Sequence, residues 1–284
     1  MRQGLPSGTS FLVSFARGLG VDEQPVDALA PELLPPWLGR IAAAPGRLGS
    51  AAALYRGAFR AGTLGLVDHA VLRTRAIDLH LEAALRTGVP QLVILGAGLD
   101  ARAWRIPALK STVVFEVDHP STQRYKQNRM GRRAPPTDIR YVAVDFEKER
   151  FFEALEHAGF RRSAPSIWIW EGVTMYLPIG AVHEAISQIT ALTTEGSTVA
   201  LTYRVPGVLP WGLVGRAAIP ILFAVAGEPL KATLDQASLA SVLGSGWELV
   251  YDDDARGWRE LTGSTARPSR TFLSERLAVV KRRH

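Results

Sequence analysis

The sequence contains no cysteine. This absence excludes disulfides, zinc sites with cysteine ligands, iron–sulfur clusters and catalysis by a thiol nucleophile. Lysine is also scarce, since 28 arginines and 5 lysines carry the positive charge of a 284-residue chain whose formal net charge is +6. A chain without cysteine is compatible with a reducing compartment, and we expect a cytoplasmic protein.

The chain also lacks a long uninterrupted apolar run. Its most apolar stretch, residues 205–230, has Arg216 near its middle and several prolines and glycines, whereas a membrane-spanning helix needs about 20 consecutive apolar residues. Pro6 and Arg17 likewise interrupt any apolar core of a secretory signal. We therefore expect no stable membrane insertion, and we interpret residues 203–233 as a helical lid over an apolar pocket.

Several catalytic motifs are missing. There is no G-x-S-x-G elbow, no G-x-x-x-x-G-K-[ST] loop and no H-E-x-x-H motif, and the six histidines show no metal-ligand spacing, so we expect no metal site. Basic residues gather over 124–133, Lys126 among them, but only Tyr125 is interleaved, and we interpret a solvated helix face without a nucleic-acid partner. The three aspartates at 252–254 are interpreted as a solvated turn rather than a cation site.

The order of apolar segments predicts an α/β protein. Seven short apolar runs read as strands buried on both faces, because they are continuous rather than alternating: 91–95, 112–117, 140–144, 166–170, 197–202, 247–251 and 276–280. Helical patterns lie before and between them, at 66–87, 120–130, 147–158, 179–192 and 234–243. This alternation predicts a doubly wound, mostly parallel seven-stranded sheet. We expect one domain over 1–284, with a helical N-terminal extension at 1–65 and the lid as an insertion.

Glycines and an acid follow the first two predicted strands, where ligands bind in such sheets. Gly96 permits a tight turn, and Gly98 lets a ligand approach the backbone closely. Asp118 lies 22 residues after Gly96 at the end of the second strand, where a carboxylate can accept hydrogen bonds from both ribose hydroxyls of a nucleoside. Together these residues favour a nucleoside site over an ordinary turn.

Two further acids follow the third and fourth strands. Asp145 either accepts from an adenine amine, with Phe146 against the ring, or caps the next helix. Glu171 follows the fourth strand. A lining with three carboxylates suits S-adenosylmethionine, which carries a sulfonium and an ammonium, better than a nicotinamide cofactor with its pyrophosphate.

Four ordered segments, QLVILGAGLDARAWRI, FEVDHP, AVDF and WEGVTMYL, resemble the leucine carboxyl methyltransferase family, which includes bacterial polyketide O-methyltransferases. The resemblance covers roughly residues 66–205 and implies the class I methyltransferase fold with S-adenosylmethionine as cofactor. It implies that an arginine before the first strand, Arg73 or Arg75, holds the cofactor carboxylate. The usual leucine at position 146 is replaced by Phe146. The other implied cofactor contacts are Gly96, Asp118, Asp145 and Glu171.

Residues after the fourth and fifth strands are expected to face the acceptor. Tyr176, Tyr203 and Arg204 follow those strands, and Arg204 either pairs with an acceptor carboxylate or lies on the surface beside the lid. Trp211 and Phe223 give the lid its apolar bulk, so we expect a small, apolar acceptor of polyketide type from secondary metabolism.

The expected activity is O-methyl transfer to a carboxyl or phenolic oxygen. A carboxylate needs no base at neutral pH, whereas a phenol does, and neither His119 nor His183 holds a clear acceptor position. No catalytic residue is therefore assigned, and a carboxyl acceptor is slightly favoured. The alternatives are an NAD(P)-dependent oxidoreductase and a catalytically silent member of the fold that binds S-adenosylmethionine or another nucleoside. We expect a monomer or a homodimer.

Overall fold

The computed structural model describes residues 6–20, 27–145, 150–206 and 230–283. Phe146 lies outside these residues, and so does most of the expected lid, with Trp211 and Phe223. The roles assigned to these three side chains therefore stay predictions.

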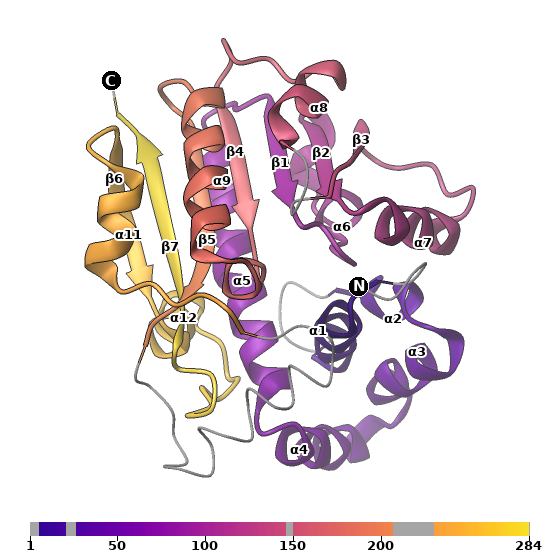
Figure 1. Ribbon diagram of the computed structural model, residues 1–284. Helices are drawn as coiled ribbons and strands as arrows, with labels where there is room; N and C mark the ends of the chain where they lie inside the picture. The colour runs from indigo at the N-terminus through magenta and orange to yellow at the C-terminus, as the bar shows by residue number, and fades with distance from the viewer. Residues whose placement is uncertain (1–5, 21–26, 146–149, 207–229, 284) are drawn as a thin grey trace.

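A seven-stranded sheet forms the centre of the molecule (Figure 1). Its order is β3-β2-β1-β4-β5-β7-β6, in which β1 to β5 are parallel and β7 is antiparallel to both of its neighbours. The order reverses between β1 and β4, which makes this the switch point where doubly wound sheets bind ligands. The strands are β1 Gln91–Leu95, β2 Val113–Asp118, β3 Ile139–Ala143, β4 Ser166–Trp170, β5 Thr198–Arg204, β6 Trp247–Asp253 and β7 Glu275–Arg282.

Helices cover both faces of the sheet and its carboxyl edge (Figure 1). One face packs against α8 Phe151–His157, α9 Ile179–Leu192 and α11 Gln236–Leu243. The other packs against α5 Leu66–Leu85 and α12 Ala255–Thr262. Two helices follow the first two strands, α6 Arg102–Arg105 and α7 Pro120–Met130. The helices at the carboxyl edge are α1 Gly8–Leu19, α2 Ala30–Leu33, α3 Pro36–Ala42 and α4 Ala52–Gly62.

The sheet confirms the predicted fold class. All seven predicted strands are present, and their ends differ from the prediction by at most two residues. The central strands β1 and β4 are buried along their whole length, which explains why their sequences are apolar without alternation. Among the described helices, none combines the length and apolar character that crossing a membrane requires.

One interpretation of a charged segment is wrong, and a second is wrong at one residue, Lys126. Asp252 and Asp253 belong to β6, and Asp254 caps α12 by accepting from the Arg256 N–H at 2.8 Å, so these aspartates do not form a solvated turn. Lys126 is buried, and its Nζ donates to Glu116 Oε2 at 2.6 Å. The basic segment therefore has a buried side, because α7 packs against the sheet.

Candidate functional site

The glycine loop after β1 lies at the switch point. Gly96 has φ of +67°, and a Cβ there would lie 2.5 Å from Val173 Cγ2 in the loop after β4. Gly98 has φ of +49°, and a Cβ there would lie 3.0 Å from Ser10 Oγ of α1. Both positions require glycine, because the backbone is left-handed and the neighbours leave no room for a side chain.

Asp118 ends β2 with its carboxylate turned toward this loop. Its Oδ2 accepts from the Gly98 N–H, and its Oδ1 accepts from the His119 N–H at 2.6 Å. Burial raises the pKa of Asp118, and these two hydrogen bonds oppose that shift. The carboxylate is thus oriented by the backbone and only half-buried, which leaves acceptor capacity for a ligand hydroxyl.

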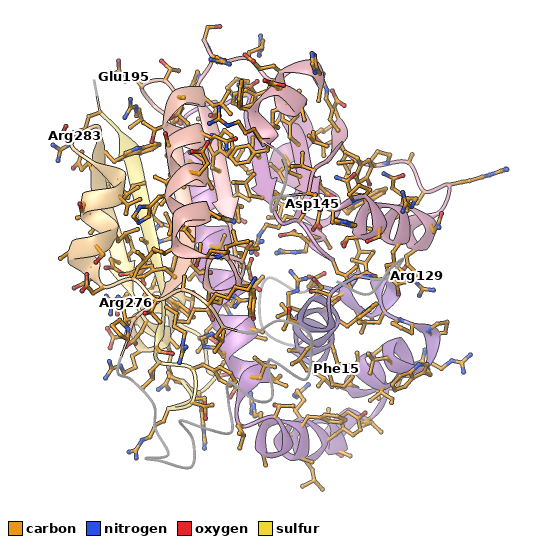
Figure 2. The ribbon with its side chains drawn as sticks, in the orientation of Figure 1. Phe15, Arg129, Asp145, Glu195, Arg276 and Arg283 are labelled. Atoms are coloured by element: carbon orange, nitrogen blue, oxygen red, sulfur yellow. The ribbon has the colours of Figure 1, made fainter. Side chains whose placement is uncertain are left out.

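Asp145 and Glu171 reach the same edge of the sheet. Asp145 lies just beyond β3, on the side of the edge that faces α7 (Figure 2). Glu171 directly follows β4, and its neighbour Gly172 has φ of +67°. The three predicted acids therefore follow β2, β3 and β4 at one edge, as parallel strands require.

The two candidate arginines of α5 point to different places. Arg73 donates from Nε to Glu171 Oε1 at 2.9 Å and from Nη1 to Glu275 Oε1 at 2.8 Å. Arg75 donates from Nη2 to the Thr262 carbonyl oxygen of α12 at 3.1 Å. The structure thus brings Arg73 to the site and turns Arg75 away from it, against α12.

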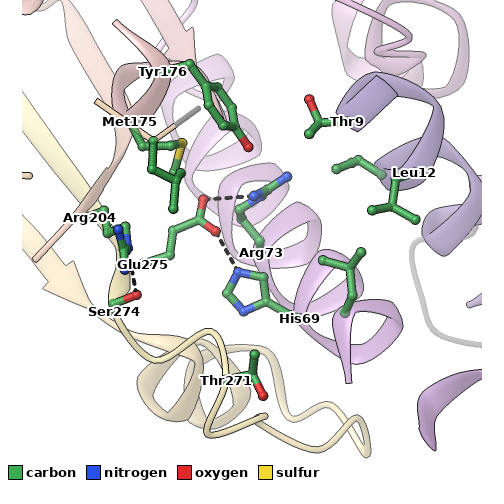
Figure 3. Close-up of a pocket in the computed structure, with 13 residues that line it drawn as sticks. Thr9, Leu12, His69, Arg73, Met175, Tyr176, Arg204, Thr271, Ser274 and Glu275 are labelled. Carbon is green, nitrogen blue, oxygen red and sulfur yellow. Dashed lines mark hydrogen bonds and ion pairs between the residues drawn. The ribbon is translucent and has the colours of Figure 1, made fainter. Parts of the chain in front are cut away.

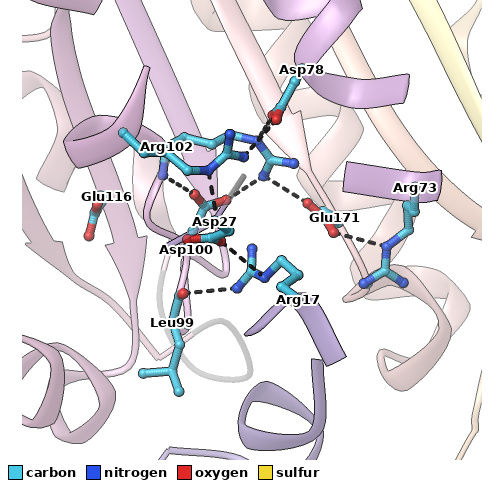
Figure 4. A network of polar contacts seen from close by, with 12 residues as sticks. Arg17, Asp27, Arg73, Asp78, Leu99, Asp100, Arg102, Glu116 and Glu171 are labelled. Atoms are coloured by element: carbon cyan, nitrogen blue, oxygen red, sulfur yellow. Dashed lines mark hydrogen bonds and ion pairs between the residues drawn. The ribbon is translucent and has the colours of Figure 1, made fainter. Parts of the chain in front are cut away.

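A buried ionic network centred on Arg102 fixes the carboxylate of Glu171 (Figure 4). Arg102 has no exposed surface; its Nη1 donates to Glu171 Oε2 at 2.7 Å and to Asp100, and its Nε donates to Asp78 Oδ1 at 2.7 Å. Burial opposes ionisation of Glu171, but Arg102 and Arg73 outweigh it and hold the pKa of Glu171 far below its usual range. Glu171 is therefore a fixed anion at the edge of the site.

Helix α1 is fastened to the glycine loop. Arg17 donates from Nη2 to the Leu99 carbonyl oxygen at 2.9 Å, and its Nε lies 3.6 Å from Asp27 Oδ2 (Figure 4). Ser10, in the first turn of the helix, lies beside Gly98, where a Cβ would come within 3.0 Å of the Ser10 hydroxyl oxygen. The N-terminal helix is therefore a wall of the site.

A pocket opens between α1, α5 and the strand ends (Figure 3). Tyr176, Arg204 and Arg73 are among the residues that line it. Arg204 donates from Nε to Ser274 Oγ at 3.2 Å, and burial lowers its pKa; the described residues include no carboxylate that forms an ion pair with it. Apolar side chains supply much of the remaining lining: Leu12, Val13, Leu66, Met175 and Leu230.

Tyr203 does not line this pocket, which corrects the prediction. It is fully buried in the core against the α9 face of the sheet, and its hydroxyl donates to Asp252 Oδ2 of β6 at 2.8 Å. The reason is strand alternation, since Tyr203 and Arg204 are consecutive in β5 and must point to opposite faces.

The family follows from comparison with known sequences. The sequence model of the leucine carboxyl methyltransferase family matches residues 27–190, more than half of the chain. The chain belongs to this family. The family assignment confirms the resemblance drawn from the four ordered segments.

Similar curated sequences include proteins from mycobacteria. One from Mycobacterium sp. (strain JLS) is 43% identical over 145 residues, 50% of this chain and 47% of the relative. One from Mycolicibacterium gilvum (strain PYR-GCK) is 35% identical over 205 residues, 71% of this chain and 64% of the relative. Both are named as candidate S-adenosyl-L-methionine-dependent methyltransferases. The chain spans about half the length of the first of these relatives.

Solved structures support the fold. A candidate methyltransferase from Thermobifida fusca YX aligns with a TM-score of 0.59 at 18% identity, covering 78% of this chain and 84% of that one. A DUF574 family protein from Streptomyces avermitilis aligns with a TM-score of 0.57 at 15% identity, covering 82% of this chain and 91% of that one. At these identities the likeness concerns the fold alone.

Two residues of this leucine carboxyl methyltransferase family member escaped the sequence analysis. His69 and Glu275 line the pocket, and His69 Nε2 lies 2.6 Å from Glu275 Oε2. No sequence signal links them, because they are 206 positions apart and Glu275 begins a strand at its amino end. Only the antiparallel direction of β7 brings that end to the carboxyl edge of the parallel strands. The described residues contain no cluster of three or more side chains suited to a metal ion.

Proposed function

We propose that this protein is an S-adenosylmethionine-dependent methyltransferase that methylates a carboxyl or phenolic oxygen of a small, largely apolar acceptor. The cofactor is S-adenosylmethionine, for which the curated relatives are named. The observation that carries the acceptor proposal is the pocket of Figure 3, which sets Arg204 and Tyr176 opposite apolar side chains of α1.

The described residues fit this cofactor. The left-handed glycines form a tight loop beside Asp118, whose half-buried carboxylate can accept from ribose hydroxyls. Arg73 is a buried guanidinium at the pocket wall that can pair with the cofactor carboxylate. Glu171 adds a fixed negative charge near a ligand whose sulfonium and ammonium are positive.

The acceptor is best explained as a carboxylate. Arg204 is half-buried, is the arginine of the lining without an ion pair among the described residues, and can orient an acceptor carboxylate. A phenol would need a base, and His69 is the histidine of the described lining. Its Nε2 is bound to Glu275 and its Nδ1 is buried, so neither nitrogen is presented to an acceptor.

The chain's own contribution is alignment and exclusion of water. S-adenosylmethionine supplies a methyl group on a sulfonium, a leaving group that needs no further activation. Arg204 holds the acceptor oxygen in place, and Leu12 and Val13 of α1 cover the pocket from the side opposite the sheet. Positioning of this kind can account for a large share of a displacement rate.

Ligand-dependent melting tests the proposal. Because a ligand that binds only the folded state stabilises it by RT ln(1+[L]/Kd), S-adenosylhomocysteine at about 100 times its Kd should add about 2.7 kcal/mol. NADP at the same concentration should leave the melting temperature unchanged. Stabilisation by NADP alone would reverse the assignment of the cofactor.

Turnover then separates an enzyme from a silent binder. We expect methyl-labelled S-adenosylmethionine to label members of a panel of aromatic and aliphatic carboxylic acids, and to label matched phenols less. Labelling of phenols alone would favour the phenolic alternative. Binding of the cofactor without transfer to any acid, phenol or cell extract would instead support a silent member of the fold.

A further inference from the structure

Arg73 belongs to a buried row of three charged or titratable side chains beside the pocket (Figure 3). Arg73 Nη1 donates to Glu275 Oε1 at 2.8 Å, and Glu275 Oε2 lies 2.6 Å from His69 Nε2. Arg73 and His69 are one turn apart on α5, whereas Glu275 begins β7. All three side chains are at least nine-tenths buried. We call this row the clamp.

The clamp restricts the guanidinium from two directions. Glu171 receives a hydrogen bond from Nε of Arg73, and Glu275 receives one from Nη1. The remaining guanidinium nitrogen, Nη2, makes no hydrogen bond with a described residue. It lies 3.5 Å from the point that a Cβ would occupy if position 172 were not glycine. An arginine side chain has many rotamers, so two fixed carboxylates are what give this nitrogen a defined direction at the pocket wall.

Glu275 is itself fixed by a rigid partner. The ring of His69 lies between those of Trp258 and Phe272, with centroids 5.2 and 5.0 Å away. Burial opposes ionisation of Glu275, but Arg73 and the hydrogen bond to His69 outweigh it and lower the pKa of Glu275 to about 2. Glu275 is therefore an anion that cannot easily rotate away from Arg73.

We propose that Glu275 is a positioning residue for Arg73, and that His69 fixes Glu275, so that Nη2 is presented to the carboxylate of the bound cofactor. This proposal rests on the proposed function above. It assigns a role to the start of β7, which none of the cofactor motifs contains. Glu275 touches neither cofactor nor acceptor in this role and acts only through Arg73.

Removing the charge of Glu275 distinguishes a positioning role from a purely electrostatic one. If Glu275 mattered only through its charge, replacing it with glutamine would remove a negative charge near the ligand carboxylate and tighten binding. If it positions Arg73, the same substitution should weaken binding. The two readings therefore predict opposite signs for Glu275→Gln.

The test compares two ligands by calorimetry. S-adenosylhomocysteine has the carboxylate, whereas decarboxylated S-adenosylhomocysteine keeps the ammonium and the nucleoside but lacks it. We expect Glu275→Gln to weaken the first ligand about tenfold, equivalent to about 1.4 kcal/mol, and the second less than about twofold. His69→Leu should reproduce this pattern, and His69→Gln, which retains a donor for Glu275, should bind nearly as the wild type does.

A neighbouring ion pair supplies the matched control. Arg276 directly follows Glu275 in β7, and its Nε donates to Asp252 of β6 at 2.8 Å. Neither Arg276 nor Asp252 is among the residues that line the pocket. Asp252→Asn should lower the melting temperature without changing the ratio of the two affinities. If Glu275→Gln does not fold, the two His69 variants still decide the question.

Three results would overturn the proposal. These are equal weakening of both ligands in Glu275→Gln, unchanged binding of both, and tighter binding of S-adenosylhomocysteine. A wild-type protein that binds neither ligand would instead contradict the proposed function itself, and the two failures are therefore distinct.

Discussion

Arg102 is a guanidinium without exposed surface that contacts three carboxylates, those of Asp78, Asp100 and Glu171. Removing one partner of such a buried pair leaves charges without compensation in a medium of low polarity. We expect Arg102→Met to lower the free energy of unfolding by about 3–5 kcal/mol, measured by denaturant titration. The exposed pair of Arg162 and Glu156 is the control, and Arg162→Met should change the free energy of unfolding far less.

Asp118 should contribute to cofactor affinity through its ribose contacts. A hydrogen bond to a charged group contributes about 1.5–3 kcal/mol, so Asp118→Ala, which loses two, should weaken S-adenosylhomocysteine binding by about a hundredfold or more. The affinity of Asp118→Asn for S-adenosylhomocysteine should lie between those of Asp118→Ala and the wild type. Asp138→Ala, an exposed aspartate near the start of β3, should bind normally. Calorimetric affinity of wild-type strength in Asp118→Ala would remove the ribose assignment.

Glu275 predicts a specific acid sensitivity. Its folded-state pKa of about 2 lies below the ordinary value of 4.5, so its stabilising effect is complete above about pH 5 and is lost as the pH falls toward 2. Over this interval the wild type should lose up to about 3 kcal/mol more stability than Glu275→Gln. If the free energies of unfolding of the two proteins fell by the same amount between pH 7 and pH 2.5, this expectation would be contradicted.

Two pairs of nearby residues show what the sequence could not decide. Arg73 and Arg75 are two positions apart on α5 and therefore about 200° apart around the helix, so only one can face the site. Tyr203 and Arg204 are consecutive in a strand and face opposite sides. In both cases the element was predictable from the sequence. Which of its two side chains faces the site was not, because that depends on how the element packs against its neighbours.

At the scale of elements, α1 supplies one wall of the pocket that we propose receives the acceptor. Leu12 is 37% exposed, so trimming it should cost little stability while opening the wall next to the acceptor. We expect Leu12→Ala to raise the KM for an acceptor found by the labelling screen, with S-adenosylhomocysteine affinity unchanged within about threefold. Leu54→Ala on α4, which is 80% exposed, is the matched control and should change neither quantity.

The lid over 203–233 stays a separate prediction. Trp211→Ala or Phe223→Ala should raise the acceptor KM and leave cofactor affinity within about threefold if the lid selects the acceptor. A role in the core would instead lower stability by about 3–5 kcal/mol and affect both ligands. Sedimentation that changes without a change in KM would assign the lid to a subunit interface.

Elements defined by local patterns were predictable, and those defined by contacts were not. The apolar runs of the strands and the residues directly after them carry their information within about ten positions, which is why Gly96, Asp118 and Glu171 could be assigned. Helix α12 was missed, because its cap Asp254 lies within a run of three aspartates that resembled a turn. The role of α1 depends on packing against the glycine loop, for which its sequence contains no motif.

At the scale of the whole molecule, the site is assembled from the two ends of the described chain and its middle. Helix α1 supplies one wall, the loops after β1 to β4 supply the residues that we assign to the cofactor, and β7 supplies Glu275. The family motifs lie in the middle portion alone. Sequence comparison therefore identifies the cofactor side more readily than the acceptor side, and residues 27–190, matched by the family model, contain neither α1 nor β7.

If Glu275 positions Arg73 as proposed, tight ligand binding requires β7 to be paired in the sheet. β7 lies between β5 and β6, so a folding intermediate with only β1 to β5 paired would have the glycine loop and the three acids but not Glu275. Non-local pairings of this kind form late, because a long stretch of chain must be ordered before they become favourable. We expect refolding, followed by the intrinsic fluorescence of the tryptophans, to reach completion together with the capacity to bind S-adenosylhomocysteine tightly, so that the ligand distinguishes finished molecules from nearly finished ones.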